Sequence, residues 1–204
     1  MKYKSTYHLF NIISILSFVL VIQVAAEEIT KPQQEFLHFG NMGGLLPTLE
    51  IDDLADEKSN GAKMIFYYCN QCHNAPGPGM HTKKEWRYVF WKMYWRMHLM
   101  NAQFKKFNIP TYAEGEVMYK YLQEYALHSI KAANVDKKSP GASVFMGTCM
   151  QCHNLPNPQM YTQKEWPTIV KRMRRHMKSM GKIIPSKKET QLTIEYLRQH
   201  AKKE

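Results

Sequence analysis

Two segments of the chain carry apolar residues at the spacing of an amphipathic helix. Each stripe begins at a tryptophan and continues at intervals of three and four residues: Trp86, Val89, Phe90, Met93, Met97 and Met100 in one, and Trp166, Ile169, Val170, Met173, Met177 and Met180 in the other. Matched capping boxes precede them, Thr82 with Glu85 and Thr162 with Glu165. No stretch shows the clear apolar–polar alternation of a half-buried strand. The pattern therefore predicts an all-α fold.

Helix start signals predict two further helices beside each stripe. The residues that can cap them carry hydroxyl side chains, with Pro or Glu close behind: Ser59, Ser139 with Pro140, Thr111 with Glu114, and Ser186 with Glu189. In each half the first helix should end near a cysteine pair, and a loop containing two prolines follows, which no helix tolerates internally. We expect the middle helix to stop near Asn101 in the first half and near Gly181 in the second.

The two halves are copies of one unit. Cys69-Asn-Gln-Cys72-His73 returns as Cys149-Met-Gln-Cys152-His153, at an offset of 149 − 69 = 80 residues. Tyr121-Leu122 returns as Tyr196-Leu197 at an offset of 75, so the first copy holds 80 − 75 = 5 extra residues near 101–109. Two copies are too few for a solenoid. We therefore predict two lobes, 59–130 and 139–204, joined by a linker at 131–138 that is short enough to hold them against each other.

The first 26 residues are predicted to be an export signal. Lys2 and Lys4 precede a mostly apolar run that ends in small residues at Ala26. This is the arrangement of a cleaved secretory signal, and it predicts a periplasmic protein. An uncleaved anchor is the alternative, although the run is short for a membrane span and contains polar residues.

Residues 27–58 lie outside the repeat and hold an acidic run. We expect this N-terminal extension to lie over the first lobe, where its carboxylates would favour the N-terminus of the nearby helix. A docking or assembly role is the alternative.

All four cysteines belong to the two Cys-x-x-Cys-His motifs, which are the attachment signature of c-type haem. Two thiols three residues apart can bond one edge of the porphyrin, and the adjoining His73 or His153 then becomes an axial ligand of the iron. A dithiol redox site would not require a histidine after each second cysteine, and no fourth ligand stands at zinc-finger spacing. The sequence predicts two covalently bound haem c groups.

From these motifs onward the chain resembles the class I cytochromes c. Gly141, Phe145 and the second haem motif look like the N-terminal helix of that family, and Glu195-Tyr196-Leu197 looks like the C-terminal helix that crosses it. In the first lobe Gly61 matches, whereas Ile65 stands in place of the aromatic residue. The resemblance covers both lobes and implies a tandem di-haem cytochrome, similar in plan to cytochrome c4. The stretch between haem motif and last helix is short in each lobe.

The sixth ligand of each iron is expected to be a methionine. Four methionines are matched between the copies, whereas no histidine outside the haem motifs is: Met80/Met160, Met93/Met173, Met97/Met177 and Met100/Met180. The spacing from tryptophan to Met93 and Met173 resembles a compact subgroup of c-type domains in which that methionine binds iron. We therefore expect Met93 and Met173 as ligands, with Met97 and Met177 next. The alternatives are that these methionines are core, or that His176 ligates the second haem.

Trp86 and Trp166 have two interpretations. Each indole could donate to a haem propionate, or each ring could simply pack in the core, which is the commoner role of a buried tryptophan.

The chain is basic, with 28 Lys and Arg against 17 Asp and Glu and a formal charge of +11. Loss of Lys2 and Lys4 with the signal would leave 11 − 2 = +9. The basic runs on the middle helices are most simply a solvated face opposite the methionines. The excess charge predicts acidic redox partners and permits loose contact with an anionic membrane, and no motif indicates nucleic acid.

Together these features predict an electron-transfer protein and not an enzyme. The expected role is an exported di-haem cytochrome c that carries single electrons between larger redox proteins, with methionine ligation favouring a high potential. One alternative is an electron-transfer subunit of a larger periplasmic oxidoreductase, in which residues 27–58 form the contact. A di-haem peroxidase is a further alternative, and it would need an iron with an open position. The sequence leaves open whether the chain is a monomer or part of a complex.

Overall fold

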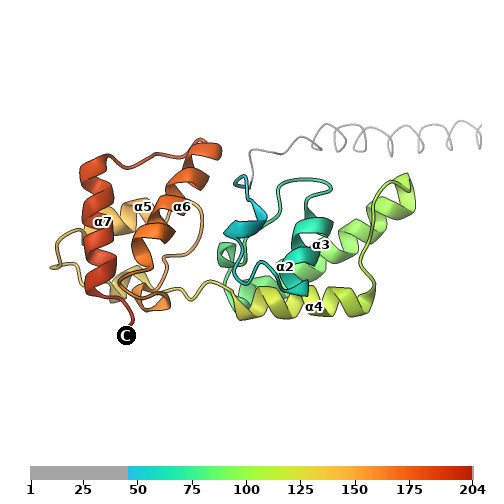
Figure 1. The fold of residues 1–204 in the computed structure, drawn as a ribbon, viewed down its shortest axis with the longest axis horizontal. Coiled ribbons are helices and arrows are strands. Elements are labelled where there is room, and N and C mark those ends of the chain that lie inside the picture. The colour runs from blue at the N-terminus through green and yellow to red at the C-terminus, as the bar shows by residue number, and fades with distance from the viewer. Residues whose placement is uncertain (1–45, 204) are drawn as a thin grey trace, which may run out of the picture. The chain divides into compact units, whose positions relative to one another are not determined.

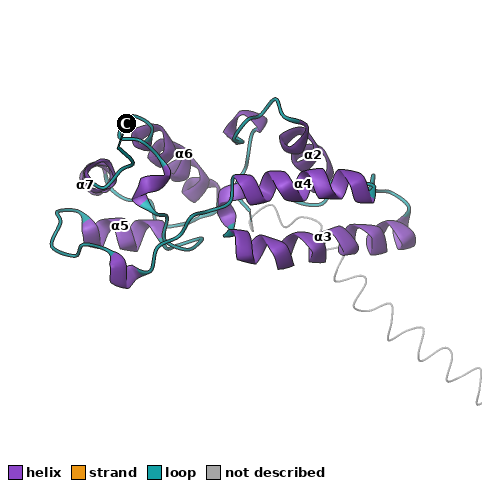
Figure 2. Cartoon of the chain, turned by 90° about the horizontal axis from the view of Figure 1, so that it is seen from below, coloured by secondary structure: helices purple, strands orange, loops and turns teal. Residues whose placement is uncertain are grey.

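The computed structural model describes residues 46–203, which belong to one compact unit. The described residues form six α-helices and contain no β-strand, so the all-α prediction is confirmed (Figures 1 and 2). The helices are α2 (Asn60–Cys69), α3 (Lys83–Phe104), α4 (Tyr112–Glu124), α5 (Ala142–Cys149), α6 (Trp166–Ser179) and α7 (Lys187–Gln199). Short 3₁₀ turns lie between them: η2 (Ile51–Asp53), η3 (Pro78–Met80), η4 (Ala132–Asn134) and η5 (Pro158–Met160).

The helices pack in two sets of three. Helix α4 packs on α2 and α3, and α7 packs on α5 and α6 in the same way (Figure 1). Each set has its own apolar core, centred on Ile65, Trp86 and Leu122 in the first and on Phe145, Trp166 and Leu197 in the second. We call residues 59–130 the first lobe and residues 139–203 the second lobe. Because apolar burial is the main stabilising force, each core is what holds its own three helices together.

In both lobes a glycine lets the first helix cross closely over the last. A Cβ atom at Gly61 would lie 2.4 Å from the Cβ of Tyr121, and one at Gly141 would lie 2.4 Å from the backbone oxygen of Leu192. Gly141 also has a φ of +82°, which other residues rarely adopt. The ring of Phe145 stacks on Tyr196 at a centroid distance of 4.8 Å. The first and last helices of each lobe therefore pack closely together at this glycine.

Four of the predicted helix starts are confirmed. The side chains of Ser59, Thr82, Thr111 and Ser186 each accept a hydrogen bond from a backbone N–H in the first turn of α2, α3, α4 and α7. The last three are complete capping boxes with a glutamate.

Two predicted starts are wrong, both in the second lobe. Helix α5 begins at Ala142 with Gly141 as its N-cap, and the hydroxyl of Ser139 bonds to Asp136 and His200 instead. Helix α6 begins only at Trp166, although Thr162 and Glu165 do bond to each other. Pro167 explains the delay, because it has no N–H to donate to the carbonyl one turn earlier, which interrupts the series of helical hydrogen bonds at this residue.

The middle helices differ in length where the extra residues were predicted. Helix α3 continues past Asn101 and ends at Phe104, and its C-cap residue, Lys105, has a φ of +50°. Helix α6 ends at Ser179, close to the expected stop at Gly181, whose φ is +61°. The additional residues of the first lobe therefore lengthen α3 by about one turn.

The predicted signal at 1–26 and residues 27–45 of the predicted extension lie outside the described residues. Residues 46–58 do cover the first lobe, because Leu49 and Leu54 are buried in its core. Among residues 46–203, none of the helices combines the length and apolar character that a membrane span requires.

Candidate functional site

The cysteines lie at the same place in each lobe. Cys69 and Cys149 are the last residues of α2 and α5, and Cys72 and Cys152 are exposed in the turn that follows. All four thiols are free. Burial raises the pKa of Cys69 and of Cys149 to about 12. Because the thiolate is the reactive form, these two buried thiols are poor candidates for dithiol–disulfide exchange at neutral pH.

The histidine of each motif is held by one ring nitrogen. Nδ1 of His73 lies 2.8 Å from the backbone oxygen of Asn74, and Nδ1 of His153 lies 2.8 Å from that of Asn154. A carbonyl oxygen only accepts, so Nδ1 carries the proton and donates it, which leaves the lone pair on Nε2. Histidines that bind metal in proteins are usually oriented by this kind of bond to a backbone carbonyl.

The second Cys-x-x-Cys-His motif opens on a cavity of about 530 Å³. Cys149, Cys152 and His153 line it, and the side of the cavity formed by α6 presents sulfur. All four matched methionines of the second lobe reach this cavity, namely Met160, Met173, Met177 and Met180. The structure thus brings together the cysteines, the histidine and the candidate sixth ligands that the sequence places up to 31 residues apart, counting from 149 to 180.

The methionines on the middle helices lie outside the two clusters of core residues. Neither cluster of the described residues includes Met93, Met97 and Met100, or their counterparts Met173, Met177 and Met180. Met177 is nevertheless buried, at 6% exposed, whereas the other five are partly exposed. The core-packing interpretation therefore agrees with the structure for Met177 and is not supported for the other five.

His176 also reaches the second cavity. Its residue is 8% exposed, and its Nε2 is buried without a hydrogen-bond partner among the described residues. Burial lowers its pKa, although Asp53, whose Oδ2 lies 3.7 Å from Nε2, acts in the opposite direction. The corresponding residue of α3 is Arg96. The second lobe thus offers a nitrogen donor that the first lobe does not offer at this position.

The two tryptophans are held in the same way in both lobes, and not as the propionate hypothesis requires. Nε1 of Trp86 donates to the backbone oxygen of Pro78 at 2.7 Å, and Nε1 of Trp166 donates to that of Pro158 at 2.8 Å. Both rings are buried in their cores. The indole has a single donor, so its capacity is already used, and the core-packing interpretation agrees with the structure.

The glutamine inside each motif has a role that the sequence did not reveal. Nε2 of Gln71 donates to the backbone oxygen of Asn108 at 2.8 Å, and the N–H of Asn108 donates to Oε1 of Gln71 at 2.7 Å. Gln151 makes the same pair of bonds with Ile183, at 3.0 Å each. Each glutamine thereby keeps the loop that leads into the last helix next to the Cys-x-x-Cys-His motif. Its identity in both copies was the available signal.

The basic run of α6 is only partly a solvated face. Arg172 donates to the backbone oxygen of Asp53, Arg175 pairs with the Asp53 carboxylate, and Arg174 donates to Pro185. The Asp53 carboxylate does serve a helix N-terminus, because it accepts a hydrogen bond from the backbone N–H of Glu50, the N-cap of η2, at 3.1 Å. The same carboxylate also joins residues 46–58, which are anchored in the first core, to the middle helix of the second lobe.

Further contacts join the lobes. Nδ2 of Asn154, next to the haem-motif histidine, donates to Oε1 of Glu85 at 2.8 Å. The backbone of residues 128–130 pairs with that of 155–157, through hydrogen bonds of 2.8 and 2.9 Å. The second cavity is accordingly bordered also by Gly77 to Met80 and by Tyr125 to His128 of the first lobe.

The side chains around the second cavity can be compared with the donors that a metal or a haem requires. In residues 46–203 no group of three or more His, Cys, Asp or Glu side chains could hold a metal ion on its own. Around one cavity the second lobe gathers two free thiols, the imidazoles of His153 and His176, and thioethers, and this donor set fits a covalently attached haem. Comparison with known proteins returns no matching family model, no matching curated protein and no matching solved structure.

Proposed function

We propose that the chain is an exported di-haem cytochrome c that carries single electrons between larger redox proteins. The observation that carries the proposal is the second cavity, where a Cys-x-x-Cys-His motif and the methionines of α6 line one space. The same motif, helix crossing and methionine stripe recur in the first lobe. When bound, haem c supplies an iron that changes between its ferrous and ferric states by one electron.

The chain's residues would have distinct tasks in this function. Cys69 and Cys72, or Cys149 and Cys152, would hold each group covalently. His73 and His153 would each give Nε2 to the iron, kept in orientation by the bond from Nδ1. Gln71 and Gln151 would keep the backbone beside the motif in place.

A methionine thioether would be the sixth ligand of each iron, and Met93 and Met173 are the proposed ligands. A helix holds its side chains on a rigid frame, so a methionine on α3 or α6 would stay at the iron in both oxidation states. Fixed ligands mean little rearrangement on electron transfer. The carrier role depends on this property, because an enzyme would need an open position.

The contacts between the lobes support passage of electrons within one chain. Asn154 beside His153 bonds to Glu85 of the first lobe, and residues of both lobes border the second cavity. The net positive charge supports acidic redox proteins as donor and acceptor, with association that weakens as salt is added.

The test is an optical spectrum of the chain produced in a host that attaches c-type haem. The expected result is two covalent haems per chain by the pyridine method, a methionine-to-iron charge-transfer band, and no spectral shift with carbon monoxide. Replacing Cys149 and Cys152 by alanine should leave one haem, and replacing all four cysteines should leave none. A chain that takes up no haem would overturn the proposal, and a carbon monoxide shift in the unmodified protein would favour the peroxidase alternative.

A further inference from the structure

Helix α3 carries an exposed aromatic stripe on the face opposite its methionines. Tyr88, Trp95 and Leu99 are 69%, 64% and 70% exposed, and intervals of seven and four residues place them on one line along the helix. Beside them Tyr112, 64% exposed, stacks on Trp91 of α3 at a centroid distance of 5.7 Å. Single exposed apolar residues are common, whereas a contiguous group of them marks an interaction surface.

The second lobe shows that the fold does not require this stripe. The matching positions of α6 are Thr168, Arg175 and Ser179, and all three are exposed. The inner faces of α3 and α6 carry the same tryptophan and methionines. The two helices thus share the tryptophan and methionines of their inner faces and differ at the exposed positions of the stripe, which indicates that the stripe serves something outside the lobe.

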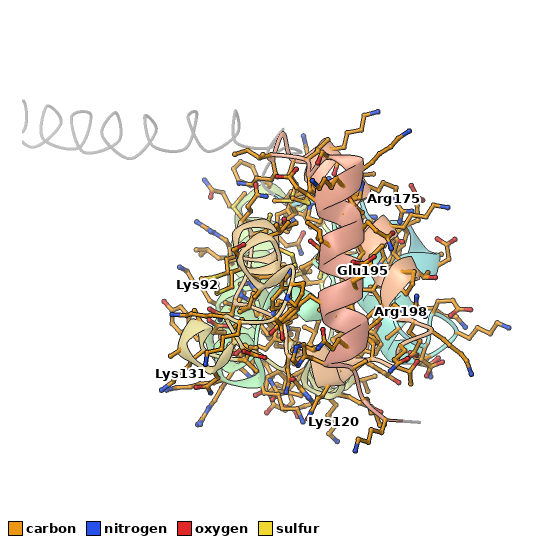
Figure 3. The ribbon with its side chains drawn as sticks, turned by 90° about the vertical axis from the view of Figure 1, so that its left-hand side faces the viewer. Lys92, Lys120, Lys131, Arg175, Glu195 and Arg198 are labelled. Atoms are coloured by element: carbon orange, nitrogen blue, oxygen red, sulfur yellow. The ribbon has the colours of Figure 1, made fainter. Side chains whose placement is uncertain are left out.

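Lysines frame the stripe on both sides. At 100° per residue, Lys84 and Lys92 lie about 40° to either side of Tyr88 around the helix, and both are exposed. Nζ of Lys92 lies 5.6 Å from the Tyr88 ring centroid, and Figure 3 shows Lys92 at the periphery with its side chain directed outward. The single acidic residue of α3 is Glu85, which is engaged by Thr82 and by Asn154. The face of α3 is thus aromatic at its centre with lysines on both sides, and the acidic group beside it is Glu116 of α4, which acts on Tyr112.

We infer that this face of α3 binds an anionic membrane surface. Tryptophan and tyrosine have apolar rings with a polar tip, which suits the boundary between lipid headgroups and acyl chains, and lysine can bury its stem while its ammonium meets phosphate. A protein partner is usually held by side chains that fill pockets at the centre of an interface. Here the side chains stand out from the convex face of one helix, which matches a flat partner. The inference does not depend on haem.

The test is sedimentation of the chain with lipid vesicles. The chain should lack residues 1–26, so that the N-terminal apolar run cannot account for binding. Vesicles of phosphatidylcholine with phosphatidylglycerol should bind it, vesicles of phosphatidylcholine alone should bind it weakly, and salt should reduce the binding. The triple variant Tyr88→Thr, Trp95→Gln, Leu99→Ser, which takes two of its residues from α6, should bind the anionic vesicles about tenfold more weakly or worse.

Two further variants separate the causes. Trp95→Arg adds a positive charge while it removes the ring: weaker binding supports insertion of the aromatic stripe, and stronger binding would show a purely electrostatic attraction and overturn the proposal. Ile183→Ser removes a side chain that is 80% exposed outside this face, and it should leave binding unchanged. Circular dichroism checks that each variant is folded. The inference is refuted if the unmodified chain binds no vesicles, whether or not it forms a dimer that depends on the stripe. It is also refuted if the triple variant binds vesicles as well as the unmodified chain does.

Discussion

Gln71 and Asn108 hold each other by two hydrogen bonds, of 2.8 Å from Nε2 to the backbone oxygen and 2.7 Å from the backbone N–H to Oε1. The glutamine lies between the two cysteines of the motif, and Asn108 lies just before the last helix of the lobe. Gln151 and Ile183 form the same pair. In each lobe the glutamine amide thus pairs with the backbone N–H and C=O of one residue, as a neighbouring β-strand would. This fixes the backbone of that residue beside the Cys-x-x-Cys-His motif.

Replacing Gln71 by alanine should lower the free energy of unfolding by about 1–2 kcal/mol. The substitution removes both bonds to Asn108 and a third one, from Nε2 to the backbone oxygen of Tyr68, at a partly exposed site. Chemical denaturation measures the change. Gln103→Ala, at an exposed position of α3, should change stability by about 0.5 kcal/mol or less. An equal effect of the two substitutions would show that the pair with Asn108 adds nothing.

Gly141, the N-cap of α5, and Gly147, within α5, should respond to alanine in opposite ways. At Gly141 a Cβ would lie 2.4 Å from the Leu192 backbone oxygen and the φ is +82°, so Gly141→Ala should cost about 2 kcal/mol or more. At Gly147, on the same helix, nothing lies within 4 Å of a new Cβ, so Gly147→Ala should stabilise by about 0.5–1 kcal/mol. Thermal unfolding decides between this result and a common response of both sites.

The helices could be predicted from the sequence wherever local signals agree with packing. Capping residues and glutamates mark α3, α4 and α7 because the bonds that they make lie within one helical turn. The same signals fail at Ser139 and Thr162. At Ser139 the hydroxyl bonds to distant His200, and at Thr162 a proline five residues later delays the helix.

The sequence indicates which residues form the candidate site, but not the contacts that surround them. The repeat points to the cysteines, histidines and methionines because each copy repeats them at one offset. The link from Asp53 to Arg175 joins residues 122 positions apart that have no counterpart in the first copy, so no local or repeated pattern could indicate it. The same holds for the bond from Asn154 to Glu85.

Replacing Asp53 by asparagine should destabilise the protein by about 1 kcal/mol at neutral pH, a modest effect because Arg175 is more than half exposed in water. Burial would raise the pKa of Asp53, but the hydrogen bonds from Arg175 and from the backbone of Glu50 outweigh it and hold this pKa below its ordinary value.

The pH dependence of this effect has a definite sign. A carboxyl whose pKa is lower in the folded than in the unfolded chain stabilises the fold above its unfolded pKa, and the stabilisation disappears as the pH falls through the folded pKa. The difference in free energy of unfolding between the unmodified and the Asp53→Asn protein should therefore have its full size at pH 6–7, well above the ordinary carboxyl pKa of about 4. It should vanish in strong acid. Denaturation curves at several pH values test this, and a difference that grows in acid would contradict it.

Single substitutions can separate His176 from the four methionines of the second lobe as candidate ligands at the second cavity. If Met173 binds the second iron, Met173→Ala should remove about half of the methionine charge-transfer band, since one of two proposed thioether bonds is lost, and should let carbon monoxide bind at one haem per chain. Met93→Ala should do the same at the first haem. His176→Ala should leave the band intact, because in that case the imidazole lies in the cavity without binding iron. If instead Met173→Ala keeps the full charge-transfer band and His176→Ala binds carbon monoxide, two histidines bind the second iron. The first lobe, which has Arg96 at the position of His176, would then hold the haem of higher potential.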